Sequence, residues 1–177
     1  MSLVLNEDQV ILKQSAADFV KKESPVSRVR KLRDERDPDG FSRVLWRKMA
    51  ELGWQGMLIP EQYGGLSMGY MDLACVLEEC GRNLVPEPLL STVALGANAV
   101  LLGGSEEQKR DVLPRVADGS LVMTVAYQEK ASRYDLAKVT CRAERRGNGY
   151  VLDGEKTLVL DGHVADQLIV VARTSGA

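Results

Sequence analysis

Histidine is nearly absent from the sequence, where His163 is the only one among 177 residues. Zinc sites draw on several histidine, cysteine or carboxylate ligands, and Ser-His-Asp and Cys-His mechanisms need a histidine as their base. One histidine therefore excludes most metal sites and every such mechanism except one built on His163. This residue follows a turn signal with no second ligand nearby in the sequence, which favours a surface or hydrogen-bonded histidine.

Cysteine and long apolar runs are also scarce. The three cysteines, Cys75, Cys80 and Cys141, form no C-x-x-C pair, which indicates idle thiols in a reducing compartment. The polar and acidic residues Asn6, Glu7 and Asp8 occur close to the first residue, a pattern that predicts no signal peptide. The longest apolar stretch, residues 89–102, is interrupted by polar residues and is shorter than the roughly 20 residues of a membrane span. We therefore predict a cytoplasmic protein without membrane insertion.

The sequence also lacks a large excess of charge of either sign. Lysine and arginine total 23, aspartate and glutamate total 25, and the net charge is −2. Such a chain lacks the basic field of nucleic-acid-binding proteins, so a nucleic-acid partner is not expected. The densest charged run, residues 28–39, mixes both signs and is typical of a solvated helix face.

Helix start signals fill the first two thirds of the chain. Asn6 with Gln9, and Ser105 with Gln108, match the pattern of a capping box, in which two side chains satisfy the first amides of a helix. At 24–25 a serine precedes a proline, which predicts a capping hydroxyl and a proline in the first helical position. Apolar residues at helical spacing follow the signal at Asn6, and the mixed charged run of residues 28–39 follows the signal at 24–25, so helices are predicted, the second one largely solvated.

The hydrophobic period changes near residue 120. We predict strands over residues 121–126, 137–143 and 168–172, and a hairpin in which 150–152 and 157–160 flank a turn at Asp153 and Gly154. The fold class predicted is α+β, with an all-α helical domain over residues 1–120 and part of an antiparallel β-barrel-like domain over 121–177. A few strands with open edges are marginal alone, so we expect the β-domain to be incomplete.

Five strings of residues occur in the order and at the intervals of one flavoprotein family. They are LGW at 52–54, IPEQYGG at 59–65, LEECGR at 77–82, GSEEQK at 104–109 and GYVLDGEKT at 149–157. With them the chain resembles the acyl-CoA dehydrogenase family.

This resemblance implies a helical domain, a middle β-domain and a C-terminal four-helix domain, of which this sequence contains the first and part of the second. It also implies FAD as cofactor, an acyl-CoA thioester as substrate, and α,β-dehydrogenation in which a base takes a proton while flavin accepts a hydride. The base lies, in most members, on the third domain, so no catalytic residue is assigned here and the chain alone is expected to be inactive.

The family's flavin-contacting positions map onto five residues of this sequence. Gln128 stands where a flavin-binding threonine is usual, Leu158 where a tryptophan covers the ring, and Leu160 where a hydroxyl reaches a flavin nitrogen. Arg133 and Tyr134 stand where the family has a small glycine and a serine near the pyrophosphate and thioester. The resemblance thus implies cofactor binding at Gln128, Leu158 and Leu160, and substrate binding at Arg133 and Tyr134.

Two alternatives stay open for Arg133 and Tyr134. They bind the carboxylate or phosphate of an unusual thioester, since arginine binds such groups bidentately, or they fill the space of an absent flavin. Among the family's acidic positions in this stretch, Glu129 and Asp135 are retained.

Three functions are consistent with these positions. The chain is part of an FAD-dependent acyl-CoA dehydrogenase with altered flavin motifs, acting in a homo- or hetero-oligomer. Alternatively it is a non-catalytic partner subunit of a heteromeric acyl-CoA dehydrogenase, which the loss of the hydroxyl at Leu160 favours. The third is a truncated interaction module whose β edges another copy must cover.

Overall fold

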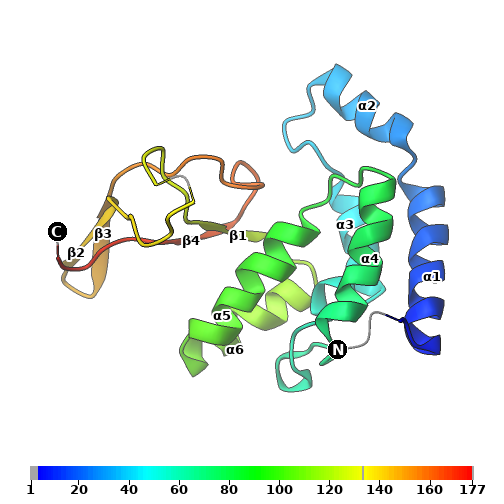
Figure 1. The fold of residues 1–177 in the computed structure, drawn as a ribbon, viewed down its shortest axis with the longest axis horizontal. Coiled ribbons are helices and arrows are strands. Elements are labelled where there is room, and N and C mark those ends of the chain that lie inside the picture. The colour runs from blue at the N-terminus through cyan, green and yellow to red at the C-terminus, as the bar shows by residue number, and fades with distance from the viewer. Residues whose placement is uncertain (1–3, 133, 177) are drawn as a thin grey trace.

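The computed structural model describes residues 4–132 and 134–176 (Figure 1). Helices and helical turns come first, in the order α1 (Glu7–Glu23), α2 (Val26–Glu35), α3 (Arg43–Glu51), two 3₁₀ turns (Trp54–Gly56 and Glu61–Tyr63), α4 (Tyr70–Arg82), a π-helical stretch (Leu90–Ala97), α5 (Asn98–Gly103) and α6 (Glu106–Ala117). The strands follow, as β1 (Met123–Ala126), β2 (Arg142–Arg146), β3 (Gly149–Asp153) and β4 (Gln167–Val170). The predicted fold class, a helical domain followed by part of a β-domain, is confirmed.

Two predicted capping boxes are present. The backbone N–H of Gln9 donates to the Asn6 side chain at 2.8 Å, and the Gln9 side chain accepts from the Asn6 backbone at 3.1 Å. The same reciprocal pair joins Ser105 and Gln108 at the start of α6. These caps could be predicted from the sequence because the two partners of each lie three residues apart, within one helical turn.

The third start signal marks a helix but works differently. Pro25 is the residue before α2, and the helix begins at Val26, so proline does not occupy the first helical position. The Ser24 hydroxyl does not cap the backbone and accepts a hydrogen bond from the Arg28 side chain at 3.1 Å. The predicted capping role of this serine is therefore wrong, because its hydroxyl oxygen accepts from Arg28, one helical turn later, and not from a backbone N–H.

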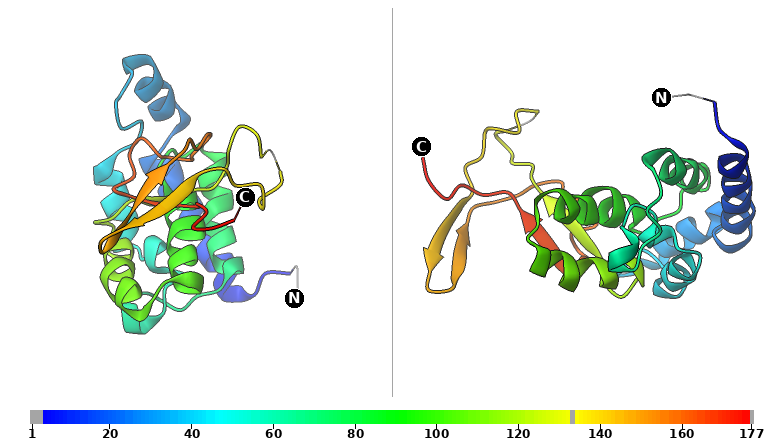
Figure 2. Two further views of the ribbon diagram at one scale, coloured as in Figure 1. Left: turned by 90° about the vertical axis from the view of Figure 1, so that its left-hand side faces the viewer. Right: turned by 90° about the horizontal axis from the view of Figure 1, so that it is seen from below.

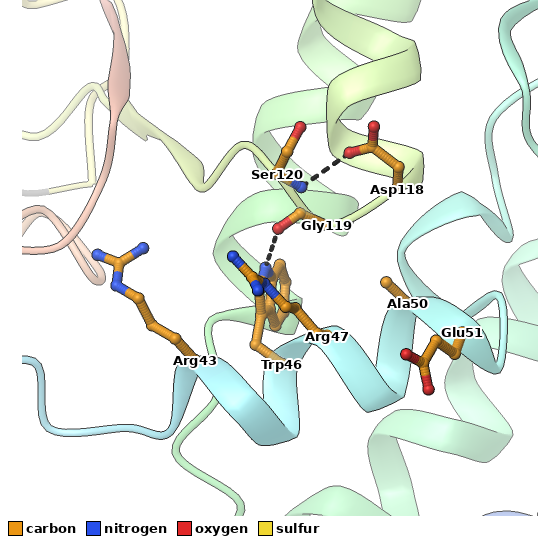
Figure 3. A pocket seen from close by; sticks show the side chains of 8 residues that line it. All are labelled: Arg43, Trp46, Arg47, Ala50, Glu51, Asp118, Gly119 and Ser120. Atoms are coloured by element: carbon orange, nitrogen blue, oxygen red, sulfur yellow. Dashed lines mark hydrogen bonds between the residues drawn. The ribbon is translucent and has the colours of Figure 1, made fainter.

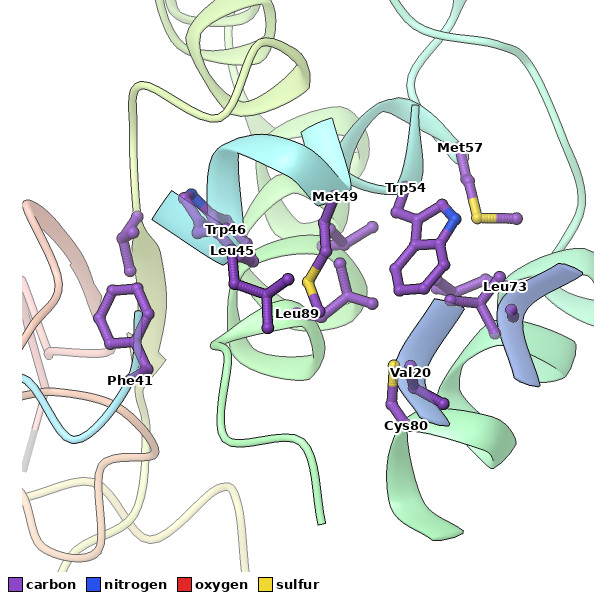
Figure 4. Packing of buried hydrophobic residues seen from close by; sticks show 14 of the residues in the cluster. Val20, Phe41, Leu45, Trp46, Met49, Trp54, Met57, Leu73, Cys80 and Leu89 are labelled. Atoms are coloured by element: carbon purple, nitrogen blue, oxygen red, sulfur yellow. The ribbon is translucent and has the colours of Figure 1, made fainter. Parts of the chain in front are cut away.

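The main hydrophobic core lies between α1, α3 and α4 (Figure 4). Its large members Trp46, Met49 and Trp54 are buried, and Phe19 meets Trp54 edge to face at 5.1 Å. Each such side chain contributes about 1.5–3 kcal/mol by leaving water. Val122 and Val164, from the β part of the chain, belong to the same cluster. The helices therefore help to hold the β segments in place.

The strands form two separate pairs. β1 and β4 pair in parallel, with Met123 opposite Gln167, whereas β2 and β3 pair antiparallel, with Arg142 opposite Asp153. A parallel pair needs a long crossover, and here the chain between residues 127 and 166 supplies it. The antiparallel order expected from the sequence thus holds for one of the two pairs. The predicted division at residue 120 stays a prediction.

The hairpin turns earlier than predicted. β2 and β3 are joined at Gly147 and Asn148, where Gly147 adopts a φ of 61°, and residues 157–160 form no strand. Gly154, expected in the turn, instead lies against the backbone of Cys141, where an added Cβ would be 2.7 Å from the Cys141 Cα. The residue is glycine because another segment approaches it closely, which a turn signal does not reveal.

Figures 1 and 2 show the hairpin at the end of the molecule away from the helices. Every residue of β3 is exposed, including the apolar side chains of Tyr150, Val151 and Leu152. An isolated two-stranded hairpin is marginally stable in water. Among the described residues, no helix is long and apolar enough to cross a membrane.

Candidate functional site

The two segments that carry the expected flavin-facing residues lie side by side. The backbone N–H of Thr157 donates to the carbonyl of Gln128 at 2.9 Å. The Lys156 ammonium donates to the carbonyl of Tyr127 at 3.3 Å. The structure thereby places Gln128 next to the segment that carries Leu158, although 30 positions separate them in the sequence.

A buried ion pair lies beneath this contact. The Lys156 ammonium donates to the Glu129 carboxylate at 2.7 Å, and the side chains are 8% and 4% exposed. The carboxylate also accepts from the backbone N–H groups of Thr140 at 2.8 Å and Cys141 at 3.0 Å, and from the Thr140 hydroxyl. Lys156, followed by Thr140 and Cys141, lowers the pKa of Glu129 from 4.5 to about 2.

Leu158 and Leu160 lie in a loop held at both ends. Leu158 is 80% exposed and Leu160 is 50% exposed, so neither packs into the core. At one end is the buried Lys156, and at the other Asp161, whose carboxylate accepts from the Ser91 hydroxyl at 2.5 Å. Leu158 and Asp161 both adopt a φ of 52°, a left-handed backbone uncommon for residues other than glycine.

The expected substrate-binding residues are not both visible. Arg133 lies outside the described residues. Tyr134 is 99% exposed, in a turn where the Asp135 N–H donates to the carbonyl of Ser132 at 2.9 Å. Its ring fills no internal space in this chain, and the roles assigned to both residues stay predictions.

The three cofactor positions fit a flavin ring in part. Gln128 is half-buried, and its side-chain amide makes no hydrogen bond within residues 4–132 and 134–176, so it is available to a ligand. Leu158 and Leu160 add apolar surface but no donor. The set offers one side-chain hydrogen-bonding group where the family resemblance implies two.

Lys156, Thr140 and Ser91 are site residues that the sequence did not single out. The only signals were the family string at 149–157, which contains Lys156, and the retained acidic family position Glu129. Sequence spacing gives no distance between residues 129, 140 and 156, so their convergence could not be predicted.

The helical part has a pocket of its own, of about 590 Å³ (Figure 3). It lies between α3 and the turn after α6, where the Trp46 indole donates to the carbonyl of Gly119 at 2.9 Å. Arg43 at its rim is engaged by Asp39 and by the ring of Phe41. The pocket contains none of the expected site residues, and across the described chain no cluster of three potential ligands could hold a metal ion.

Residues 6–120 match the family model of the acyl-CoA dehydrogenase N-terminal domain. This chain belongs to the acyl-CoA dehydrogenase family. The resemblance read from the five sequence strings is therefore confirmed. The chain is 32% identical, over 98% of the chain's own length, to the mitochondrial 2-methylacyl-CoA dehydrogenase of Solanum tuberosum.

Solved structures agree with this family assignment. The chain superposes on the Tcur3481-Tcur3483 steroid acyl-CoA dehydrogenase, in a variant form, with a TM-score of 0.83 and 35% identity over 94% of its length. It superposes on the ChsE4-ChsE5 complex from Mycobacterium tuberculosis with a TM-score of 0.82 and 27% identity over 99% of its length. The chain spans less than half of these relatives, 42% of the Solanum protein and 45% of each solved chain.

Proposed function

We propose that this protein acts in the α,β-dehydrogenation of acyl-CoA thioesters, as a subunit of an FAD-dependent acyl-CoA dehydrogenase. Family membership supports the reaction class. The observation that carries the proposal is the hydrogen bond from Thr157 to Gln128, because it joins the two flavin-facing segments at one surface. Bound FAD would supply the hydride acceptor.

The residues of this chain would bind and orient rather than carry out the chemistry. Gln128 would offer its side-chain amide to the cofactor, and Leu158 and Leu160 would exclude water from one side of the ring. Arg133 and Tyr134 would lie toward the thioester. The base that takes the α-proton would come from outside residues 1–177, as the family resemblance implies.

The visible spectrum of the purified chain, before and after adding excess FAD, tests this proposal. A flavin band at about one FAD per chain, shifted by an acyl-CoA thioester, is the result expected if this subunit binds its own cofactor. A Gln128→Leu variant should then bind FAD more weakly, since a lost hydrogen bond costs ~1 kcal/mol. The absence of a band in every assembly that contains this chain would contradict the proposal.

A second candidate is a non-catalytic partner subunit in a heteromeric acyl-CoA dehydrogenase. It is favoured by Leu160, which has nothing to donate, and by the ChsE4-ChsE5 complex among the structural relatives. Its test is the co-purification of this chain with a flavin-competent homologue. One FAD per pair of chains would support it, and two FAD per pair would contradict it.

The truncated interaction module is the remaining alternative. It predicts self-association through the β segments without any flavin. Sedimentation of the chain alone, with and without FAD, separates it from the other two.

A further inference from the structure

The ion pair of Glu129 and Lys156 joins three segments of the chain. The Glu129 carboxylate receives four donors, from Lys156, from Cys141 and, twice, from Thr140. An ionised carboxylate has about four acceptor sites, so this one is saturated. Segments 127–129, 140–141 and 156–157 are therefore fixed relative to one another at one buried point.

The pair is asymmetric. Two of the four donors are backbone N–H groups, of Thr140 and Cys141, which no substitution of a side chain removes. Residue 129 must therefore offer acceptors, and residue 156 must be the donor. Exchanging the two charges would place an ammonium against two N–H groups.

The loop carrying Leu158 and Leu160 depends on its anchors. Its leucines are at least half exposed, so burial of its own side chains contributes little to holding its conformation. Lys156 anchors one end, and the contact of Asp161 with Ser91 in the π-helical stretch anchors the other. Between them the backbone is left-handed at Leu158 and Asp161.

We propose that Glu129 and Lys156 are positioning residues, which hold the segment 157–161 beside Gln128 so that Leu158 and Leu160 face a bound ligand. The identity of that ligand as flavin rests on the proposed function, whereas the geometry of the anchor does not. Buried ion pairs contribute little net stability and in some proteins select one conformation. If the pair instead had a general structural role, its removal would lower the stability of the whole chain.

The test compares Glu129→Gln with Glu87→Gln in the 177-residue chain. Glu87 forms another buried ion pair, with Arg28 at 2.6 Å and side-chain exposures of 0% and 18%, but lies in the helical part. Amide hydrogen exchange is followed by mass spectrometry at a temperature where circular dichroism shows every variant folded. Glu129→Gln should speed exchange about tenfold in peptides covering 128–141 and 156–161, with the helices unchanged. Glu87→Gln should leave those peptides unchanged.

Titration with FAD, read by its fluorescence, is the second measurement. Glu129→Gln and Lys156→Met should each lower FAD affinity about tenfold, Lys156→Arg should retain most of it, and Glu87→Gln should not change it. The exchanged pair Glu129→Lys with Lys156→Glu should fail to restore binding.

The outcomes separate the two proposals. Unchanged exchange in both peptides, or acceleration spread equally over the helices, would overturn the positioning role. Local acceleration together with no FAD binding by the unmodified chain would support positioning and count against flavin binding by this chain alone. FAD binding that survives Glu129→Gln at full affinity would overturn positioning and leave the proposed function standing.

Discussion

Glu129 is buried yet ionised, because Lys156 and three further donors surround its carboxylate. Its pKa is about 2 in the folded chain, against an ordinary value of 4.5. A carboxyl whose pKa is lowered by folding adds stability above its unfolded pKa and loses that contribution as the pH falls through the folded value. The contribution of Glu129 is therefore complete near neutral pH and disappears between about pH 4.5 and pH 2.

Acid unfolding gives the corresponding prediction. The urea concentration at which peptides covering 128–141 and 156–161 lose protection from amide exchange should fall more steeply between about pH 5 and pH 2 in the unmodified chain than in Glu129→Gln, which has no carboxyl to protonate at this position. Parallel curves for the two chains would show that Glu129 does not contribute to the acid sensitivity.

Neighbouring glycines at the turn after Tyr63 should respond differently to alanine. A Cβ on Gly65 would lie 2.0 Å from the Ile59 carbonyl oxygen, whereas Gly64 has nothing within 4 Å but a φ of +83°. Gly64→Ala should cost about 1–2 kcal/mol through left-handed strain alone. Gly65→Ala should cost more, because the backbone of Ile59 must move. Urea unfolding of the two variants measures both, and equal losses would contradict the close approach.

At the scale of elements, helix starts were predictable where their partners were local. Asn6 with Gln9, and Ser105 with Gln108, lie three residues apart, so the sequence contains the whole interaction. The hairpin turn also had a local signal, the dipeptide Gly147-Asn148, but a second turn dipeptide competed with it. The dipeptide at 153–154 looked like a turn, but its glycine is required by the distant Cys141.

The cap of α6 yields a prediction of its own. Ser105→Ala removes the oxygen that accepts from the Gln108 N–H at 3.2 Å, and should lower the free energy of unfolding by ~1 kcal/mol. Ser105→Asp restores an acceptor and a favourable charge at the helix start, and should recover most of the loss. Urea unfolding at matched pH tests both variants. A Ser105→Asp chain no more stable than Ser105→Ala would contradict the capping role.

At the scale of the whole molecule, the family and the order of helices and strands could be predicted, whereas the site geometry could not. The five family strings build the scaffold and are local. The contacts of Glu129 with Thr140 and Lys156 cross 11 and 27 positions, distances at which composition and spacing give no register. Tyr134 was interpreted as a filler of space or a ligand contact, and its exposure became visible only with the fold.

The exposed hairpin predicts association. Val151 lies on β3 and is 44% exposed, and strand edges with exposed apolar residues bind other strands or surfaces. Sedimentation should show that the chain associates as its concentration rises, and Val151→Lys should weaken this association. Asn148→Lys adds the same charge at the exposed turn of the hairpin and should have less effect. Equal effects of the two lysines would assign the change to charge alone.

The parallel pairing of β1 with β4 sets an order of events during synthesis. Val122, just before β1, binds the side chain of Asp166, just before β4, across 44 positions. The helices can begin to pack against one another once α6 has left the ribosome, whereas Val122 and Val164 join their core later. The edge of β1 stays unpaired until β4 has been synthesised. Such non-local pairing is slow, so the newly made chain passes through a stage in which the edge of β1 is unpaired and exposed to other chains.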